Sequence, residues 1–516
     1  MRFRQWLGAG ALGAVATILA CGGAMNIDRG ARRLSNATTT TDVLQHHNNL
    51  SKDGLYVDPL FTQAAAANTH RDLSFNAVLP GQVYAQPLYV QNGPGGAAAI
   101  IAATEENSVV AVDAASGAQL WQRDLDPPAN RTQLPCGNIS PHVGITSTPA
   151  IDLDSRTIYV AANTNDGTFA PRHKIYALSI DDGSTIDGWP VDVAASVSFG
   201  GLPFQSTPQH QRGALLLLNG YLYVTYGGHF GDCGIYHGWV VAVPVADPSN
   251  PTAFATDARG GGIWAPAGLS SDGTSVFATT GNTFGTAMVW QGGEAVFRLG
   301  DGAAFSGDTA DYFAPTNWFA LDSTDADIGG VAAVPVSVAG ALPSELMVAV
   351  GKNGMAYLLD RANLGGIGGE LTSVRLANPI VIHAPATFTT ASGTFVSVAS
   401  TAIGIGCPGT FGNLITFQIG ATSPPSINIA WCASVGGRYA PIITTTDGSS
   451  EAVLWTISSG LPTRLKAYDA ETGTVLFDGG GDDEVIGPLR SFLAPIAVNG
   501  RIYIAGDNQI YAFTTQ

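Results

Sequence analysis

The sequence predicts an all-β fold, an eight-bladed β-propeller whose blades are four-stranded antiparallel sheets. Three observations support this prediction. One hairpin pattern recurs along the 516 residues, prolines mark the repeats at a nearly constant spacing, and almost no stretch has a helical pattern. A period of roughly 50 residues that is filled with short strands and turns is typical of a propeller, because each repeat builds one blade.

The clearest copy of the repeated hairpin is residues 107–125. Val109 to Asp113 form a buried-strand pattern, and the turn that follows ends at Gly117, which can adopt a positive φ. Leu120 and Trp121 then begin the return strand. Further copies lie at residues 174–183, 464–477 and 509–513.

A proline near the first strand of each unit gives the number of units. The marker prolines are Pro87, Pro149, Pro208, Pro266, Pro385, Pro441 and Pro495. Successive markers are 54 to 62 residues apart, except for one double-length gap between Pro266 and Pro385. Residues 329–334 fit a unit in that gap, so the sequence predicts eight blades.

The ring is expected to close through an N-terminal strand. Residues 73–78 precede the first complete blade and have the spacing of an outermost strand. The last blade, residues 492–513, has three strands and then stops. Together the two fragments complete one blade, which removes the exposed sheet edges.

The first 21 residues resemble a bacterial export signal. Arg2 and Arg4 precede an apolar run at residues 6–19, and residues 18–21 resemble a lipobox that ends on Cys21. We therefore expect a signal peptide over residues 1–21, a lipid on Cys21, a polar tether over 22–41 and the propeller over 42–516. The alternative is an ordinary secretory signal cleaved nearby. Both place the mature protein outside the cytoplasm, and the first predicts a periplasmic or outer-membrane-anchored envelope lipoprotein.

Charge and composition exclude several classes of partner. Charged residues make up 12% of the chain and the net charge is −17, with no run of Lys or Arg. Nucleic acids and anionic membrane surfaces both require a basic surface, so neither is an expected partner. Membrane contact is expected only through the lipid anchor, and the protein is expected to be a monomer.

Four cysteines remain once Cys21 is set aside, and an even number in an exported chain indicates two disulfides. Three pairings are open. Cys407 and Cys432 bracket one strand pair, and Cys136 and Cys233 lie in loops of neighbouring units, so these two pairings are favoured. A metal site is not expected, because no CxxC or matched His spacing is present. His46 and His47, or His229 and His237, would be its weaker candidates, since an isolated loop histidine is usually solvated.

Long loops identify the functional face. We label the strands of each blade A to D from the axis outward. Most B–C and D–A loops are long whereas the A–B turns are short, and the two long classes emerge on the same face of a propeller. That long-loop face is the expected surface for a small molecule or a cell-envelope protein.

Residues at the starts of the A strands should surround the axial channel on this face. The candidates for an axial site are Gln86, Trp264, Asp327, His383, Arg438 and Arg490, with Tyr84, Thr146, Ser147, Gln205, Ser206, Ile263, Asp325, Tyr439 and Phe492 beside them. Arginines suit carboxylates and a tryptophan suits stacking, which indicates a planar, anionic or polyol ligand. The alternative is that these side chains pair with one another and with channel water.

The repeats at residues 111–121 and 467–473 resemble those of pyrroloquinoline-quinone-type propellers, the superfamily of quinoprotein alcohol dehydrogenases. Segments 45–49, 81–90, 144–149, 236–239 and 351–361 are similar to uncharacterised secreted members, so the resemblance covers residues 42–516. It implies an axial quinone between a tryptophan and a vicinal Cys-Cys disulfide, a calcium held by a carboxylate and an amide, and an aspartate base. By this resemblance Trp264 matches the tryptophan, Asp327 the catalytic aspartate, and Arg438 or Arg490 the partner of the quinone carboxylates.

The sequence departs from that pattern in two respects: it has no Cys-Cys pair and no haem-attachment CxxCH. Two functions are therefore expected. The first is a lipid-anchored binding or scaffold propeller of the cell envelope, similar to the propeller lipoprotein of the outer-membrane barrel-assembly machine. The alternative is a quinone-dependent oxidoreductase of alcohols or sugars that passes electrons to an external acceptor. The cofactor is left unassigned, with pyrroloquinoline quinone and calcium as the candidates.

Overall fold

A computed structural model describes residues 39, 41–165, 167, 170–409, 411–487 and 489–516. The chain divides into two units, residues 1–35 and 36–516, and the second is described here. The expected signal peptide, Cys21 and nearly all of the expected tether lie outside the described residues. Within the described residues no helix is both long and apolar enough to cross a membrane.

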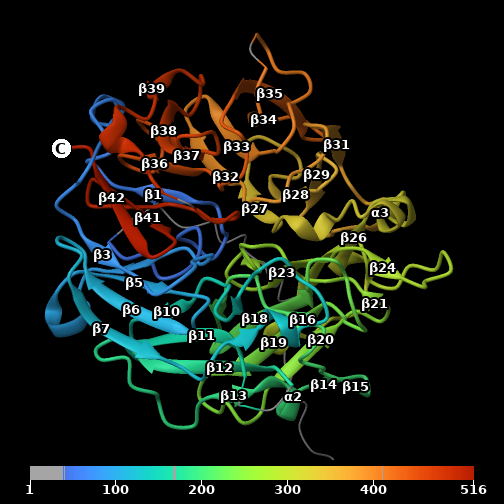
Figure 1. The fold of residues 1–516 in the computed structure, drawn as a ribbon. Helices are drawn as coiled ribbons and strands as arrows, with labels where there is room; N and C mark the ends of the chain where they lie inside the picture. The colour runs from blue at the N-terminus through green and yellow to red at the C-terminus, as the bar shows by residue number, and fades with distance from the viewer. Residues whose placement is uncertain (1–38, 40, 166, 168–169, 410, 488) are drawn as a thin grey trace, which may run out of the picture. The chain divides into compact units, whose positions relative to one another are not determined.

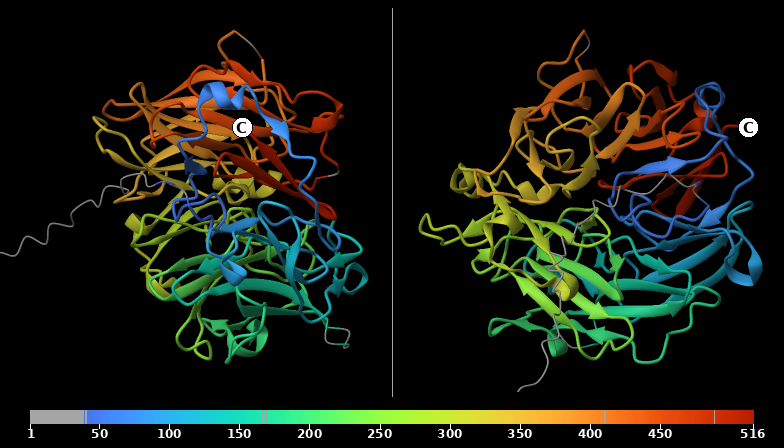
Figure 2. Two further views of the ribbon diagram at one scale, coloured as in Figure 1. Left: turned by 90° about the vertical axis from the view of Figure 1, so that its left-hand side faces the viewer. Right: turned by 180° about the vertical axis from the view of Figure 1, so that it is seen from behind.

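The described residues from 41 onward form an eight-bladed β-propeller, as the sequence predicts. The blades follow one another around a centre in chain order (Figures 1 and 2). The first four blades are β4(Leu88–Val90)-β5(Ala99–Ala103)-β6(Ser108–Asp113)-β7(Gln119–Asp124), β10(Ala150–Asp152)-β11(Thr157–Thr164)-β12(Arg172–Ser179)-β13(Val191–Asp192), β17(Leu216–Leu218)-β18(Tyr221–Gly228)-β19(Trp239–Pro244)-β20(Thr252–Ala255), and β22(Ser270–Ser271)-β23(Val276–Thr279)-β25(Val296–Leu299)-β26(Tyr312–Ala314).

The next three blades have the same antiparallel order. They are β27(Val334–Ser337)-β28(Glu345–Val350)-β29(Met355–Asp360)-β31(Thr372–Arg375), β32(Ala386–Thr390)-β33(Gly393–Ala399)-β34(Leu414–Gly420)-β35(Ser426–Ala433), and β36(Ile442–Thr445)-β37(Val453–Ser458)-β38(Arg464–Asp469)-β39(Val475–Phe477). Short helices α1(Gln63–Ala66), α2(Val193–Ser196) and α3(Trp318–Thr324) lie in the connections. Short strands outside this pattern are β8(Ala129–Asn130), β9(His142–Val143), β14(Ser198–Phe199), β15(Leu202–Pro203), β16(Gln209–His210), β21(Arg259–Gly260), β24(Thr283–Phe284) and β30(Gly366–Ile367).

The eighth blade joins the two ends of the propeller. Its inner strands are β40(Ile496–Val498), β41(Arg501–Gly506) and β42(Gln509–Thr514). The N-terminal strands β2(His70–Arg71) and β3(Ala77–Val78) both pair with β42 in antiparallel register. The predicted closure by an N-terminal strand is therefore confirmed.

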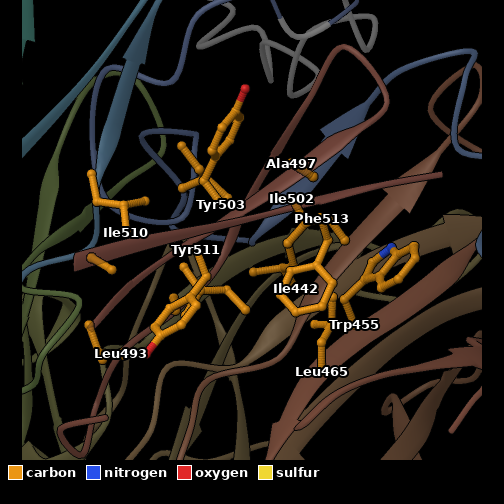
Figure 3. Close-up of a cluster of buried hydrophobic side chains, with 14 of the residues drawn as sticks. Ile442, Trp455, Leu465, Leu493, Ala497, Ile502, Tyr503, Ile510, Tyr511 and Phe513 are labelled. Atoms are coloured by element: carbon orange, nitrogen blue, oxygen red, sulfur yellow. The ribbon is translucent and has the colours of Figure 1, made fainter. Parts of the chain in front are cut away.

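Apolar side chains are buried mainly between neighbouring blades. The largest cluster lies where blades seven and eight meet, and includes Ile442, Trp455, Ile502 and Phe513 (Figure 3). Two tryptophans of outermost strands also link blades by hydrogen bonds. Trp121 Nε1 donates to the carbonyl of Ile180 at 2.9 Å, and Trp431 Nε1 donates to that of Ala470 at 2.8 Å. The Trp of the sequence repeat therefore binds the C–D turn of the next blade.

The glycine of the repeat is required by that contact. Gly473 has φ +74°, and a Cβ at this position would lie 2.6 Å from Cδ2 of Trp431. We expect Gly473→Ala to lower the free energy of unfolding by about 1–3 kcal/mol, from backbone strain and the clash together. Gly460→Ala is the control, because its Cβ would meet nothing within 4 Å. Equal urea midpoints for the two variants would contradict this explanation.

The segment at residues 43–57, here called the N-terminal plug, crosses the axis. Its backbone bonds to the innermost strands of five blades, through Tyr89, Ile151, Ser271, Thr387 and Ile443. Strand β1(Leu55–Val57) within it pairs in parallel with β36. The contacts at Ile151 and Ser271 lie toward the A–B ends of these strands. The plug therefore closes the end of the channel opposite the long-loop face.

Candidate functional site

An axial cavity of about 690 Å³ opens among the long loops. Most residues of its wall precede the A strands of successive blades, as expected for the axis of a propeller. The lining includes Tyr84, Arg212, Trp264, Asp327, His383, Arg438, Arg490 and Phe492, with Asn138, His229, Phe230, Asp232, Tyr236, Asn282, Asp325, Lys352, Ile380 and Ile382 from the loops. The cavity therefore combines aromatic faces with charges of both signs.

Two arginines of the wall have no acidic partner. Arg212 belongs to blade three and Arg438 to blade seven, so they face the cavity from opposite sides of an eight-membered ring. Within the part of the chain that the structure describes, neither guanidinium forms an ion pair within 4.0 Å, and the buried carboxyl of Glu105 acts on Arg212 only from a longer distance. Arg212 packs 5.0 Å from the ring centroid of Phe492, its Nε has no hydrogen-bond partner, and burial lowers its pKa. Arg212 is half-buried, and a guanidinium at such a position without a close carboxylate is stabilised when an anion binds it.

Arg490 differs from this pair because a carboxylate already holds it. Its Nη2 lies 2.6 Å from Oδ2 of Asp507, and its Nε also donates to that carboxylate. The guanidinium lies 5.9 Å from the ring centroid of Tyr84. Arg490 therefore shapes the wall but contributes little free charge to a ligand.

Asp327 and Trp264 form the opposite wall. Trp264 Nε1 donates to Oδ2 of Asp327 at 3.1 Å, and the backbone N–H of Asn282 donates to Oδ1 at 3.1 Å. Glycines at 281 and 330 leave room for the indole, since a Cβ at either would lie 3.2 or 3.1 Å from a Trp264 atom. The indole and the carboxylate are thereby held as one rigid unit.

Lys352 adds a cation to this unit from the B–C turn of blade five. Its Nζ lies 2.6 Å from Oδ1 of Asp325 and 3.7 Å from Oδ2 of Asp327. Burial raises the pKa of Asp327 to about 6, although Lys352 opposes the shift. Behind it, burial and the nearby Asp327 hold the pKa of Glu294 well above its usual value. Asp327 is thus ionised at neutral pH but able to accept a proton.

Histidines complete the cavity wall in neutral form. Burial lowers the pKa of His383 to about 4 and that of His229 to about 3. His229 packs against the buried His210, with ring centroids 5.2 Å apart and the rings tilted by 50°. These side chains can accept or donate one hydrogen bond to a ligand without adding charge.

A disulfide crosses the loops above the cavity. Cys136 in the D–A loop after blade one is bonded to Cys233 in the B–C loop of blade three. Asn138 and Asp232, which flank the two half-cystines, line the cavity, and Asp232 Oδ1 accepts from the Tyr236 hydroxyl at 2.5 Å. The second disulfide, Cys407–Cys432, lies within blade six. Both correspond to the pairings favoured from the sequence.

Five of the six candidate site residues line the cavity, and Gln86 does not. Gln86 is buried under the plug, where its Oε1 accepts from His47 N at 3.0 Å. In blade three the lining residue is Arg212 rather than Gln205 or Ser206, because the inner strand begins only at Leu216. His46 and His47 are also not solvated. They are buried in the plug with their rings stacked 4.5 Å apart.

Sequence reasoning did not place most of the loop residues of the wall, among them Arg212, Asn282 and Lys352. Lys352 and Asn282 belong to B–C loops, whereas the sequence predicts channel lining only at the starts of the A strands. The glycines on both sides of Lys352 and Asn353 were a usable signal for a tight turn at the axis. Arg212 had no such signal beyond being one of few cations in the chain.

The residues present fit a planar carboxylate ligand better than they fit a calcium ion. The described residues contain no group of three or more His, Cys, Asp or Glu placed to hold a metal ion. Asp327 is the buried carboxylate of the wall, and the ammonium of Lys352 3.7 Å away would repel a divalent cation there. By contrast, an indole face and two guanidiniums that have no carboxylate within ion-pair distance suit an aromatic polycarboxylate.

Comparisons with known proteins agree with this architecture. No family model and no curated protein matches the sequence. Among solved structures, quinohemoprotein alcohol dehydrogenase from Comamonas testosteroni is similar at a TM-score of 0.63 and 15% identity, covering 93% of this chain and 81% of that one. The enzyme ADHIIG from Pseudomonas putida HK5 gives 0.60 and 14%, covering 92% and 80%.

A europium-containing methanol dehydrogenase gives a TM-score of 0.59 at 13% identity, covering 92% of this chain and 98% of that one. The fold is therefore the eight-bladed propeller of the pyrroloquinoline-quinone type, as the repeat resemblance implied. Identities this low establish the fold and not the activity. The two disulfides are those expected of an exported protein.

Proposed function

We propose that this protein binds a planar, aromatic polycarboxylate in its axial cavity, a ligand of the pyrroloquinoline quinone class. The observation that carries the proposal is the pair Arg212 and Arg438, which face one cavity from opposite blades without carboxylate partners. Each guanidinium can hold a carboxylate in a bidentate contact. Trp264 supplies a flat apolar surface between them. Arg490 and Lys352 pair with carboxylates of the protein, whereas Arg212 and Arg438 have no carboxylate within ion-pair distance.

The binding test is a titration of the protein with pyrroloquinoline quinone, with and without calcium, followed by tryptophan quenching. We expect saturable binding, weakened by Trp264→Leu at least about tenfold, because stacking area is lost. Trp189→Leu serves as the control, since Trp189 packs on Tyr159 in blade two. The proposal fails if no quenching saturates, or if both variants bind equally well.

Dehydrogenase activity is the second candidate, and Asp327 favours it. A buried carboxylate with a pKa of about 6 that lines the cavity is suited to act as a general base at neutral pH. A bound quinone would supply the electron acceptor. The protein would contribute Asp327 to accept a substrate proton and Lys352 to hold that carboxylate in place. Dye-linked oxidation of alcohols and sugars by the quinone-loaded protein separates this function from binding alone.

Anchorage through Cys21 belongs to the same proposal. The predicted lipobox and the two disulfides support an exported protein held at the cell envelope. Loss of membrane association in a Cys21→Ser chain would test the anchor.

A further inference from the structure

Among the described residues, eight of the sixteen large exposed apolar side chains lie in B–C loops of the long-loop face. We call them the apolar rim: Phe230, Ile235, Met288, Val289, Ile403, Ile405, Phe411 and Leu461. They come from the B–C loops of blades three, four, six and seven. Leu461 is 99% exposed and Phe411 is 77% exposed, so these side chains stand out from the loop tips. A concentration of this kind on one face is a sign of a binding surface.

The same loops carry almost no charge. Residues 281–293, 400–413 and 459–463 contain no Asp, Glu, Lys or Arg, and the loop of blade three adds only Asp232, which bonds to Tyr236. The B–C turns of blades one, five and eight are charged, with Glu105 and Glu106, Lys352, and Asp507 respectively. The D–A loops of the same face also carry charge, including the exposed Asp257, Asp482 and Asp483. The apolar rim is therefore a set of uncharged B–C loop tips, and loops that face water normally contain charged residues.

We propose that the apolar rim docks on a lipid bilayer whose surface is zwitterionic. Contact with a membrane was expected only through the lipid on Cys21, and this second contact goes beyond both that expectation and the proposed axial ligand. The apolar rim consists of separate loop tips around the mouth of the cavity. A lipid surface is uniform along its plane and can contact all of these tips, whereas a protein partner would match one continuous patch. The net charge of −17 and the uncharged loops disfavour anionic lipid.

Insertion is shallow, because loop backbone cannot leave its polar groups unpaired in hydrocarbon. The Phe, Ile, Leu and Met side chains reach the acyl boundary while the loop backbone stays among the headgroups. Phe230 belongs both to the rim and to the cavity wall. Docking therefore places the mouth of the cavity beside the membrane, where an apolar molecule could enter from the lipid.

Fluorophores at single positions test the proposal in the full chain. Cys21→Ser leaves an introduced cysteine as the free thiol, since the other four cysteines form disulfides. An environment-sensitive dye is placed at Phe411→Cys or Leu461→Cys. Matched controls carry it at Leu342→Cys, in an A–B turn, or Val475→Cys, on an outermost strand. Each protein is mixed with phosphatidylcholine vesicles, with or without phosphatidylglycerol and acyl-chain quenchers.

The rim dyes are expected to shift to the blue and to be quenched from the acyl chains, while the control dyes remain unchanged. Combining Phe411→Ser with Leu461→Ser should lower partitioning at least about tenfold. Anionic lipid should not strengthen binding. Vesicle-bound protein whose rim dyes still report water would overturn the proposal, as would rim dyes that shift only when a soluble envelope protein is added.

Discussion

Lys52→Met is expected to make the protein more stable at pH 6 relative to the wild type, and the gain should shrink as the pH rises. Lys52 is fully buried in the N-terminal plug, and its Nζ donates to Gln45 Oε1 at 2.9 Å. Burial lowers the pKa of Lys52 to about 7. Its ordinary value is near 10.4, so the unfolded chain binds the proton over a pH range in which the folded chain does not.

The sign follows from that difference. Between the unfolded and folded pKa values, the wild type loses stability as the pH falls, by about 1.4 kcal/mol per pH unit. Below pH 7 both states are protonated and the loss is complete. The stability gap between Lys52→Met and the wild type should therefore widen by about 2–3 kcal/mol from pH 9 to pH 6. Urea unfolding at several pH values measures it.

Lys466→Met is the matched control, because Lys466 lies in an outer strand and pairs with Asp478 at 2.5 Å. Its unfolding free energy is measured at the same pH values as that of Lys52→Met. Burial also lowers the pKa values of His46 and His47, so the plug loses further stability below about pH 6.5 in both proteins. A gap between Lys52→Met and wild type that stays constant from pH 9 to pH 6 would show that Lys52 is not buried as a neutral amine.

The plug shows where sequence reasoning stopped. Blades were predictable because each repeat carries a local pattern of proline, strand, turn and tryptophan, and Trp121 and Trp431 perform the same contact in different blades. Residues 43–57 have no such repeat. They are held by backbone bonds to five blades that are far apart in the sequence, and only the closed ring brings these together. In the sequence, His46 and His47 therefore resemble isolated loop histidines.

The residues of the axial wall that lie just before the inner strands were predictable from the sequence. Trp264, Asp327, His383 and Arg438 lie shortly before inner strands and do line the cavity. Arg212 stands in the same relation to the inner strand of blade three, which begins at Leu216. It was not predictable from the marker proline, because β16 and the residues after it separate Pro208 from that strand. Lys352 reaches the same cavity from a B–C turn, which an assignment based on A strands could not include.

Arg212→Met should weaken binding of an aromatic polycarboxylate such as pyrroloquinoline quinone by about 100-fold or more. Removing one partner of a desolvated charged hydrogen bond typically costs 2–5 kcal/mol, which corresponds to that range. Arg438→Met should cost less, since Arg438 is exposed to solvent and Arg212 is mostly enclosed. The effect should appear in the dissociation constant measured by tryptophan quenching. Arg123→Met, on the outer strand β7, is the matched control.

Stability separates the ligand explanation from a structural one. If the guanidinium stabilises the fold by packing, its replacement lowers the free energy of unfolding. If it serves only to bind a ligand, it destabilises the ligand-free protein, and its replacement does not lower the free energy of unfolding. Arg212 has a lowered pKa and an unpartnered Nε, so Arg212→Met should unfold at the same urea concentration as the wild type or at a higher one.

The chemistry of the ligand provides a second test of the two arginines. If the carboxylates span the axis between Arg212 and Arg438, an aromatic monocarboxylate should be sensitive to one of the two substitutions, and a ligand with carboxylates at both ends should be sensitive to both. If neither substitution weakens the binding of either ligand, Arg212 and Arg438 do not bind the ligand carboxylates.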